Sequence, residues 1–112
     1  MSQYQINATS NFLKDVEEIS FWIFVTNVEQ SKNLAEAKLS QLESELITLK
    51  KKIQNFPESG EEVATRGVRK IPIYDGRFSV RWIVDHHKKT ATLISLLDSR
   101  YPKKLRNIPT EE

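Results

Sequence analysis

The chain has 112 residues, 38% of them hydrophobic, and this length predicts one domain with a modest core rather than two domains. It has no cysteine, which excludes disulfides and thiolate metal sites. Its longest apolar cluster, residues 21–25, is far too short to span a membrane, and no basic N-terminal region precedes it. We therefore expect a soluble, cytoplasmic protein without membrane association.

The formal net charge of +2 hides an asymmetry along the chain. Residues 1–65 hold six Lys/Arg against ten Asp/Glu, a balance of −4, whereas residues 66–106 hold eleven against three, a balance of +8, and residues 107–112 add −2. A localised positive field favours an acidic partner such as a nucleic acid, the ribosome or an acidic peptide. The alternative is that these charges only keep an exposed sheet in solution.

The acidic half predicts a short strand followed by two helices. Alternation over residues 4–8 indicates the strand, and Thr9-Ser10 can cap a helix over residues 12–24, whose apolar side Phe21 and Trp22 widen. Asn27 is a candidate cap for the second helix, with Gln30 in capping-box position. That helix runs to about residue 54, because apolar residues recur every three or four positions: Ala35, Leu39, Leu42, Leu46, Leu49 and Ile53. We favour an antiparallel helical hairpin within the chain over a coiled-coil dimer.

The basic half predicts three strands. After a loop through Pro57 to about Gly67, residues 66–84 form a hairpin that turns at Asp75-Gly76, and Pro72 places its first strand at an edge or a bulge. One face of the second strand carries Phe78, Val80, Trp82 and Val84, and the other carries Arg77, Ser79, Arg81 and Ile83. A polar loop at 85–89 leads to a central strand at 90–97, and residues 107–112 form a loose tail. The expected fold is α+β, with the order β-α-α-β-β-β and the helical hairpin on one face of a small antiparallel sheet.

Most small-molecule chemistry is disfavoured by the sequence. It has no nucleophile signature, phosphate-binding glycine loop or dinucleotide fingerprint, so we expect no cofactor. Adjacent histidines such as His86-His87 point apart in a hairpin loop, and without a third ligand nearby we expect no metal site.

The remaining candidate site is basic. It consists of Arg69, Arg77, Arg81, Arg100, Tyr101, Lys103 and Lys104. Arginine guanidinium groups bind phosphates or carboxylates through paired hydrogen bonds, and Tyr101 could stack on a nucleic-acid base. In RNA cleavage such a cluster could also neutralise the charge of the transition state. The alternative is that alternate residues of a one-sided sheet are charged because they face water.

The order of these features resembles the RelE/ParE superfamily of bacterial toxin–antitoxin toxins. The cues are a helix stripe at Phe12, Asp15, Val16 and Ile19, then Pro57-Glu58-Ser59-Gly60, Gly67-Val68-Arg69-Lys70, a tight turn, and the aromatic strand at 76–84. The resemblance implies a single RelE/ParE-like domain over residues 1–106. It also implies a growth-inhibiting toxin of a type II system, neutralised by a small antitoxin that is acidic and partly disordered.

Two mechanisms share this fold. RelE-like members cut messenger RNA on the ribosome, a role that would give catalytic duties to Lys70, Arg81, Arg100 and Tyr101 here. ParE-like members poison DNA gyrase, and target or antitoxin binding would then rest on Arg69, Arg77, Arg81, Lys103 and Lys104. The RelE-type pattern is incomplete, since Pro72 and Ser79 replace expected basic residues and Tyr101 comes early, so we favour ParE by a small margin. An inactive interaction module with the same fold is a third hypothesis.

Overall fold

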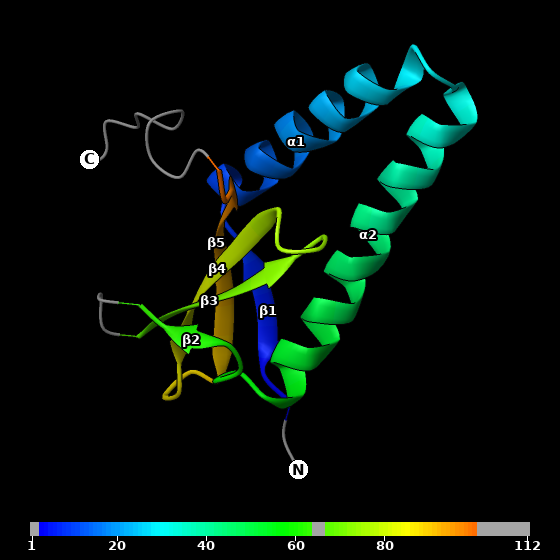
Figure 1. Ribbon diagram of the computed structural model, residues 1–112. Coiled ribbons are helices and arrows are strands. Elements are labelled where there is room, and N and C mark those ends of the chain that lie inside the picture. Colours follow the sequence, from blue (N-terminus) through cyan, green and yellow to red (C-terminus); the bar gives the residue numbers. More distant parts are fainter. Residues whose placement is uncertain (1–2, 64–66, 101–112) are drawn as a thin grey trace.

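The computed structural model describes residues 3–63 and 67–100, which form two helices and one five-stranded sheet (Figure 1). The elements are β1 Gln5–Ala8, α1 Ser10–Val28, α2 Lys32–Asn55, β2 Glu61–Glu62, β3 Val68–Ile73, β4 Phe78–Asp85 and β5 Thr90–Asp98. This order confirms the predicted α+β architecture. It adds β2, a two-residue strand inside the segment that we expected to be a loop. The predicted tail at 107–112 lies outside the described residues, so the domain limit at residue 106 stays a prediction.

The strands lie in the order β1-β5-β4-β3-β2. Strands β3, β4 and β5 pair antiparallel as predicted, and β2 adds to β3 antiparallel, whereas β1 pairs with β5 in parallel and is the exception. Parallel neighbours need a long crossover, which the helical hairpin and the other strands supply. The position of β5 between β1 and β4 confirms the predicted central strand. Ala91, Leu93 and Leu96 of β5 are at most 1% exposed, and the other residues of the strand are partly buried.

Side-chain caps set where the helices begin. The Thr9 hydroxyl accepts a hydrogen bond from the N–H of Phe12 at 3.0 Å, which confirms the predicted start of α1. The predicted cap for α2 is wrong: Asn27 lies within α1 and donates its amide to the carbonyl of Ile23 at 2.7 Å. Ser31 caps α2 instead, accepting from the N–H three residues later at 3.2 Å. Helix α1 therefore ends four residues later than we predicted.

The two helices pack against each other and against one face of the sheet. The predicted seam of α2 is buried at Ala35, Leu42, Leu46, Leu49 and Ile53 and partly buried at Leu39. Phe12 and Ile23 of α1 belong to the same core cluster, which confirms the intramolecular hairpin. Phe21 and Trp22, however, are 70% and 42% exposed, so the prediction that they widen the buried side of α1 is wrong. The connection between the helices stands clear of the sheet, which leaves this part of α1 without a strand to cover it (Figure 1).

A buried carboxylate joins α1 to β5. The register of β4 against β5 shifts between Arg81 and Trp82, so Ile94 has no opposite residue on β4. Asp15 is 1% exposed and accepts a hydrogen bond from the N–H of Leu96 at 3.0 Å. Strand β1 pairs with β5 only as far as Leu93, so the carboxylate of Asp15 supplies the acceptor for the N–H of Leu96 where β1 no longer pairs.

A four-residue turn at 74–77 joins β3 to β4. The predicted Asp75-Gly76 pair lies at its centre with φ values of 57° and 81°, and Tyr74 also has a positive φ of 57°. The turn is longer than the two-residue loop that an Asp-Gly pair favours. One cause is α2, because Glu45 accepts a hydrogen bond from the N–H of Tyr74 at 2.6 Å and holds the backbone there.

The inner and outer faces of the sheet differ as the alternation predicted. Phe78, Val80 and Trp82 are at most 1% exposed and face the helices. Strand β2 pairs only with the first half of β3, so Pro72 lies on an open edge, as predicted for a residue that cannot donate.

Neither helix among the described residues combines the length and apolarity that crossing a bilayer requires.

Candidate functional site

Two cations lie side by side on the sheet face that points away from the helices. Lys70 of β3 and Arg81 of β4 are direct cross-strand partners, and Arg81 also lies opposite Ser95 of β5. A pocket of about 150 Å³ opens here. It is lined by Lys70, Ser79, Arg81, Leu97, Asp98 and Ser99, and we call it the basic pocket.

The basic pocket is arranged for an anion. Like charges directly opposite each other destabilise a sheet. The Nε of Arg81 is also shielded from solvent and has no hydrogen-bond partner within residues 3–63 and 67–100. A phosphate or carboxylate would remove both penalties, because it neutralises the pair and accepts from the free N–H. The hydroxyls of Ser79 and Ser99 lie 3.4 Å apart in the same pocket and could add donors.

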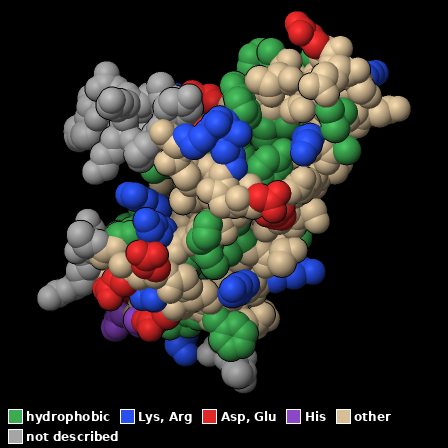
Figure 2. All heavy atoms as spheres, viewed as in Figure 1, with side chains coloured by type: hydrophobic (Ala, Val, Ile, Leu, Met, Phe, Trp, Pro, Cys, Tyr) green, Lys and Arg blue, Asp and Glu red, His purple; other side chains and the backbone are tan. Residues whose placement is uncertain are grey.

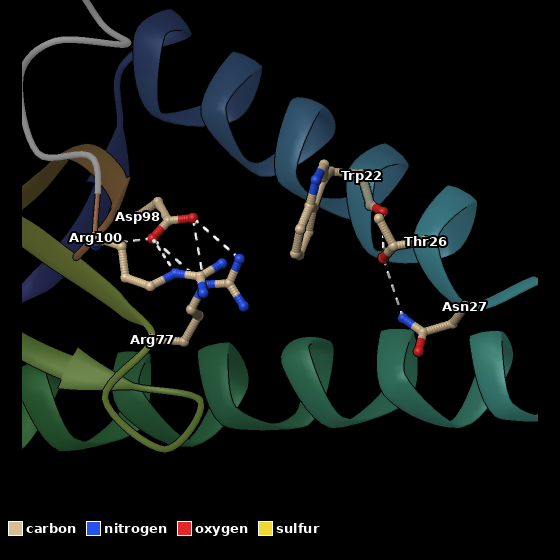
Figure 3. Close-up of polar contacts among 6 residues, drawn as sticks. All are labelled: Trp22, Thr26, Asn27, Arg77, Asp98 and Arg100. Atoms are coloured by element: carbon tan, nitrogen blue, oxygen red, sulfur yellow. Dashed lines mark hydrogen bonds and ion pairs between the residues drawn. The ribbon is translucent and has the colours of Figure 1, made fainter.

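Arg77 belongs to a different cluster, on the helix side of the sheet (Figure 3). Its guanidinium lies 4.5 Å from the ring centroid of Trp22, and its Nη2 lies 3.3 Å from a carboxylate oxygen of Asp98. The prediction that Arg77 shares a face with Arg81 is wrong, because β4 begins at Phe78 and Arg77 still belongs to the turn. Its side chain is 23% exposed and joins α1 to the end of β5.

Asp98 links the two clusters. Its carboxylate accepts from the backbone N–H of Arg100 at 2.9 Å and lies 3.9 Å from the Nε of that arginine. The Arg100 side chain is 58% exposed and does not line the basic pocket. Of the other predicted residues, Tyr101, Lys103 and Lys104 lie outside the described residues. Sequence reasoning missed Asp98, because its arginine partners come from a turn and from a strand end, where periodicity gives no signal.

Arg69 supports the fold at the other end of β3. Its Nε donates to the carbonyl of Ser59 at 2.9 Å and its Nη2 to that of Gly60 at 3.1 Å, so it holds the connection between α2 and β2. It pairs across strands with Trp82, on the inner face. The structure therefore brings together Lys70 and Arg81 among the predicted site residues, and separates Arg69 and Arg77 from them.

Two side chains have shifted ionisation. Burial raises the pKa of the Tyr74 phenol above its usual value of 10.0, and the nearby carboxylate of Glu45 raises it further. The backbone N–H of Lys88 lowers the pKa of the Asp85 carboxyl below its usual 3.8, because it donates to the charged form at 3.0 Å. Neither group lines the basic pocket.

A third polar cluster lies at the opposite end of the sheet and was also missed. His86 contacts the hydroxyl of Tyr4 through Nδ1 at 2.6 Å and the carboxylate of Glu58 through Nε2. These residues are 82 and 28 positions from His86, so no local pattern relates them. The part of the chain that the structure describes contains no group of three or more His, Cys, Asp or Glu side chains placed to hold a metal.

Comparison with solved structures relates the fold to bacterial toxins, although no protein-family profile and no curated protein sequence matches the chain. A chain of the chromosomal ParDE toxin–antitoxin system from P. aeruginosa superposes with a TM-score of 0.60 at 15% identity, covering 86% of this chain and 96% of that one. A chain of the intact E. coli RelBE complex gives 0.56 at 13% identity over 86% and 96%. The isolated E. coli RelE toxin gives 0.54 at 14% identity over 94% and 98%.

These superpositions span 96–98% of each known chain and 86–94% of this one. At this level of identity they establish the fold rather than the activity. The predicted resemblance in architecture is confirmed: the chain has the RelE/ParE-like toxin fold.

Proposed function

We propose that the chain is the growth-inhibiting toxin of a type II toxin–antitoxin system, acting in the cytoplasm and held inactive by a cognate antitoxin. The observation that carries the proposal is a toxin-like fold over 86–94% of the chain with a basic pocket on the sheet face that the helices leave open. An antitoxin that is acidic and partly disordered suits this face, because its carboxylates could occupy the site of the Lys70–Arg81 pair.

We favour DNA gyrase over messenger RNA as the target. RNA cleavage needs a group that takes a proton from the attacking hydroxyl, and the candidates in the basic pocket are Lys70 and Asp98. A charged lysine cannot accept a proton, and the carboxylate of Asp98 is already engaged by Arg77 and Arg100, so this pocket suits the binding of an anion better than proton transfer. Pro72 and Ser79 also occupy positions where RelE-like toxins carry cations, which supports ParE-like action by contact.

Ribosome-dependent RNA cleavage is the second candidate. It is favoured by the unpartnered Nε of Arg81 beside Lys70, since a scissile phosphate would satisfy both groups. The resemblance would then give Arg100 and Tyr101 catalytic roles, although Arg100 does not line the basic pocket and Tyr101 lies outside the described residues. In this case the chain is an endoribonuclease rather than a gyrase poison.

Two assays on one induced culture, together with one on purified DNA gyrase, separate the candidates. A gyrase poison should relax plasmid supercoiling in cells and inhibit purified DNA gyrase, while primer extension shows intact messages. An endonuclease should leave supercoiling unchanged and give cuts at ribosome-bound codons. Unchanged supercoiling at toxin levels that stop growth would contradict gyrase as the target. Normal growth after induction would contradict both toxin mechanisms and would support the third hypothesis, an inactive interaction module.

A matched pair of variants tests the role of the basic pocket in either mechanism. Lys70→Gln with Arg81→Gln removes both cations of the pocket and should abolish the effect on the target. Lys38→Gln removes a cation from the first half of α2, which does not line the pocket, and should retain the effect.

A further inference from the structure

Three side chains from distant parts of the sequence form a hydrogen-bonded relay at the end of the sheet opposite the basic pocket. Tyr4 precedes β1, Glu58 lies between α2 and β2, and His86 begins the loop between β4 and β5. The Tyr4 hydroxyl lies 2.6 Å from Nδ1 of His86, whose Nε2 is bonded to the Glu58 carboxylate. In Figure 2 the histidine side chains lie beside acidic ones at the lower left of the molecule.

The acceptor at one end fixes the direction of the relay. An ionised carboxylate can only accept hydrogen bonds, so Nε2 of His86 must carry a proton toward Glu58. In the neutral ring Nδ1 is then a bare acceptor, and the phenol of Tyr4 donates to it. This is the order of an activated nucleophile: a hydroxyl, a base that takes its proton, and a carboxylate that positions the base.

An open, shallow pocket of about 620 Å³ adjoins the relay. Its walls include Tyr4, Glu58 and His86 together with the apolar rings of Phe56 and Pro57. Phe56 is the C-cap residue of α2, and it is 67% exposed. Such walls suit an acyl or aryl group beside the phenol.

We propose that Tyr4 is an acyl-accepting nucleophile, a covalent modification site served by His86 as general base and by Glu58 as positioning residue. The substrate class is an activated acyl donor, such as an aryl ester or thioester. A bond forms between Oη of Tyr4 and the acyl carbon, the bond to the leaving aryl oxygen or sulfur breaks, and the phenol proton passes to Nδ1 of His86. The leaving group departs with the electron pair, so no oxidant or further reactant is needed.

The chain contains a matched reference for the histidine and a second phenol. His87 is the neighbouring histidine on the same exposed loop and does not line the pocket, so it reports what the same chemistry does without the relay. Tyr74 is a phenol outside the relay, but burial raises its pKa, so a free tyrosine amide is the stricter reference for the phenol.

The test is acetylation of the folded chain by p-nitrophenyl acetate at neutral pH, with N-acetyltyrosinamide in the same solution as an exposed phenol. Peptide mass spectrometry should find the acetyl ester on Tyr4, formed at least about 10-fold faster than on Tyr74 or the free amide, since general bases typically contribute 10²–10⁴-fold. This comparison needs no variant. A Tyr4 rate equal to that of the free amide overturns the proposal.

Variants then assign the roles. His86→Asn should lower Tyr4 acetylation about 10-fold, while His87→Asn should leave it unchanged. The groups facing His86 are Tyr4 and Glu58, with Asp85, His87 and Lys88 on its own loop. Glu58→Gln should slow Tyr4 acetylation, because it removes the carboxylate that orients His86, and Glu58→Asp, which keeps a carboxylate, should restore part of the rate. A rate that Glu58→Gln leaves unchanged, or equal effects of the two histidine variants, contradicts the relay.

Discussion

The Lys70–Arg81 pair should weaken the fold in the absence of its anion. Direct cross-strand pairs interact by about 0.2–1 kcal/mol, and like charges make this unfavourable. Both side chains are half-buried, so solvent screening is incomplete. A double-mutant cycle of Lys70→Gln and Arg81→Gln isolates the interaction from packing changes that each substitution makes alone. We expect a repulsive coupling energy within that range.

Urea unfolding of the four proteins at low salt measures this coupling. In about 1 M NaCl the Debye length falls to about 3 Å, and the coupling should nearly vanish. For a domain of this size, relieving about 0.5 kcal/mol should raise the Tm by roughly 2–4 °C. A coupling that is attractive, or that persists in high salt, would refute the view that Lys70 and Arg81 repel each other across the two strands.

Three further predictions follow from the fold. Asp15→Ala leaves the buried N–H of Leu96 without its acceptor and should lower the free energy of unfolding by about 1–3 kcal/mol in urea titrations, whereas Asp15→Asn, which keeps an acceptor oxygen, should cost less. Tyr74 should titrate above pH 10.0 by ultraviolet absorbance. Because the pKa of Tyr74 is higher in the folded chain than in the unfolded chain, its neutral phenol stabilises the fold fully below pH 10.0, and this contribution is lost as the pH rises through the folded pKa. A Tyr74 that titrates at pH 10.0 would contradict this. Gly60→Ala should destabilise the chain strongly in thermal melts, because φ is +75° and the new Cβ would lie 2.4 Å from the carbonyl oxygen of Lys70; a Tm close to that of the native chain would contradict this.

Periodicity was sufficient to predict the helical hairpin and the inner face of the sheet. The seam from Ala35 to Ile53 and the alternation at Phe78, Val80 and Trp82 each extend over several turns or pairs, so burial follows directly from spacing. Boundaries were harder to predict. Asn27 and Ser31 are both good caps, and only the fold shows that the first stabilises the last turn of α1.

The site could be predicted only in part, because its members depend on where strands begin. Arg81 lies inside β4, so alternation placed it correctly on the outer face. Arg77 lies one residue before β4, and in the conformation of the turn its side chain packs on the ring of Trp22. The Tyr4–His86–Glu58 relay could not be predicted, since a parallel edge strand, a hairpin loop and a helix end meet only in three dimensions.

The most direct test of the proposed function is bacterial growth after tightly controlled induction of the chain. We predict that the native chain stops growth, that Lys38→Gln does the same, and that the Lys70→Gln, Arg81→Gln double variant allows growth at an equal level of folded protein. Normal growth with the native chain would contradict the toxin assignment, and arrest by the double variant would contradict the role of the basic pocket.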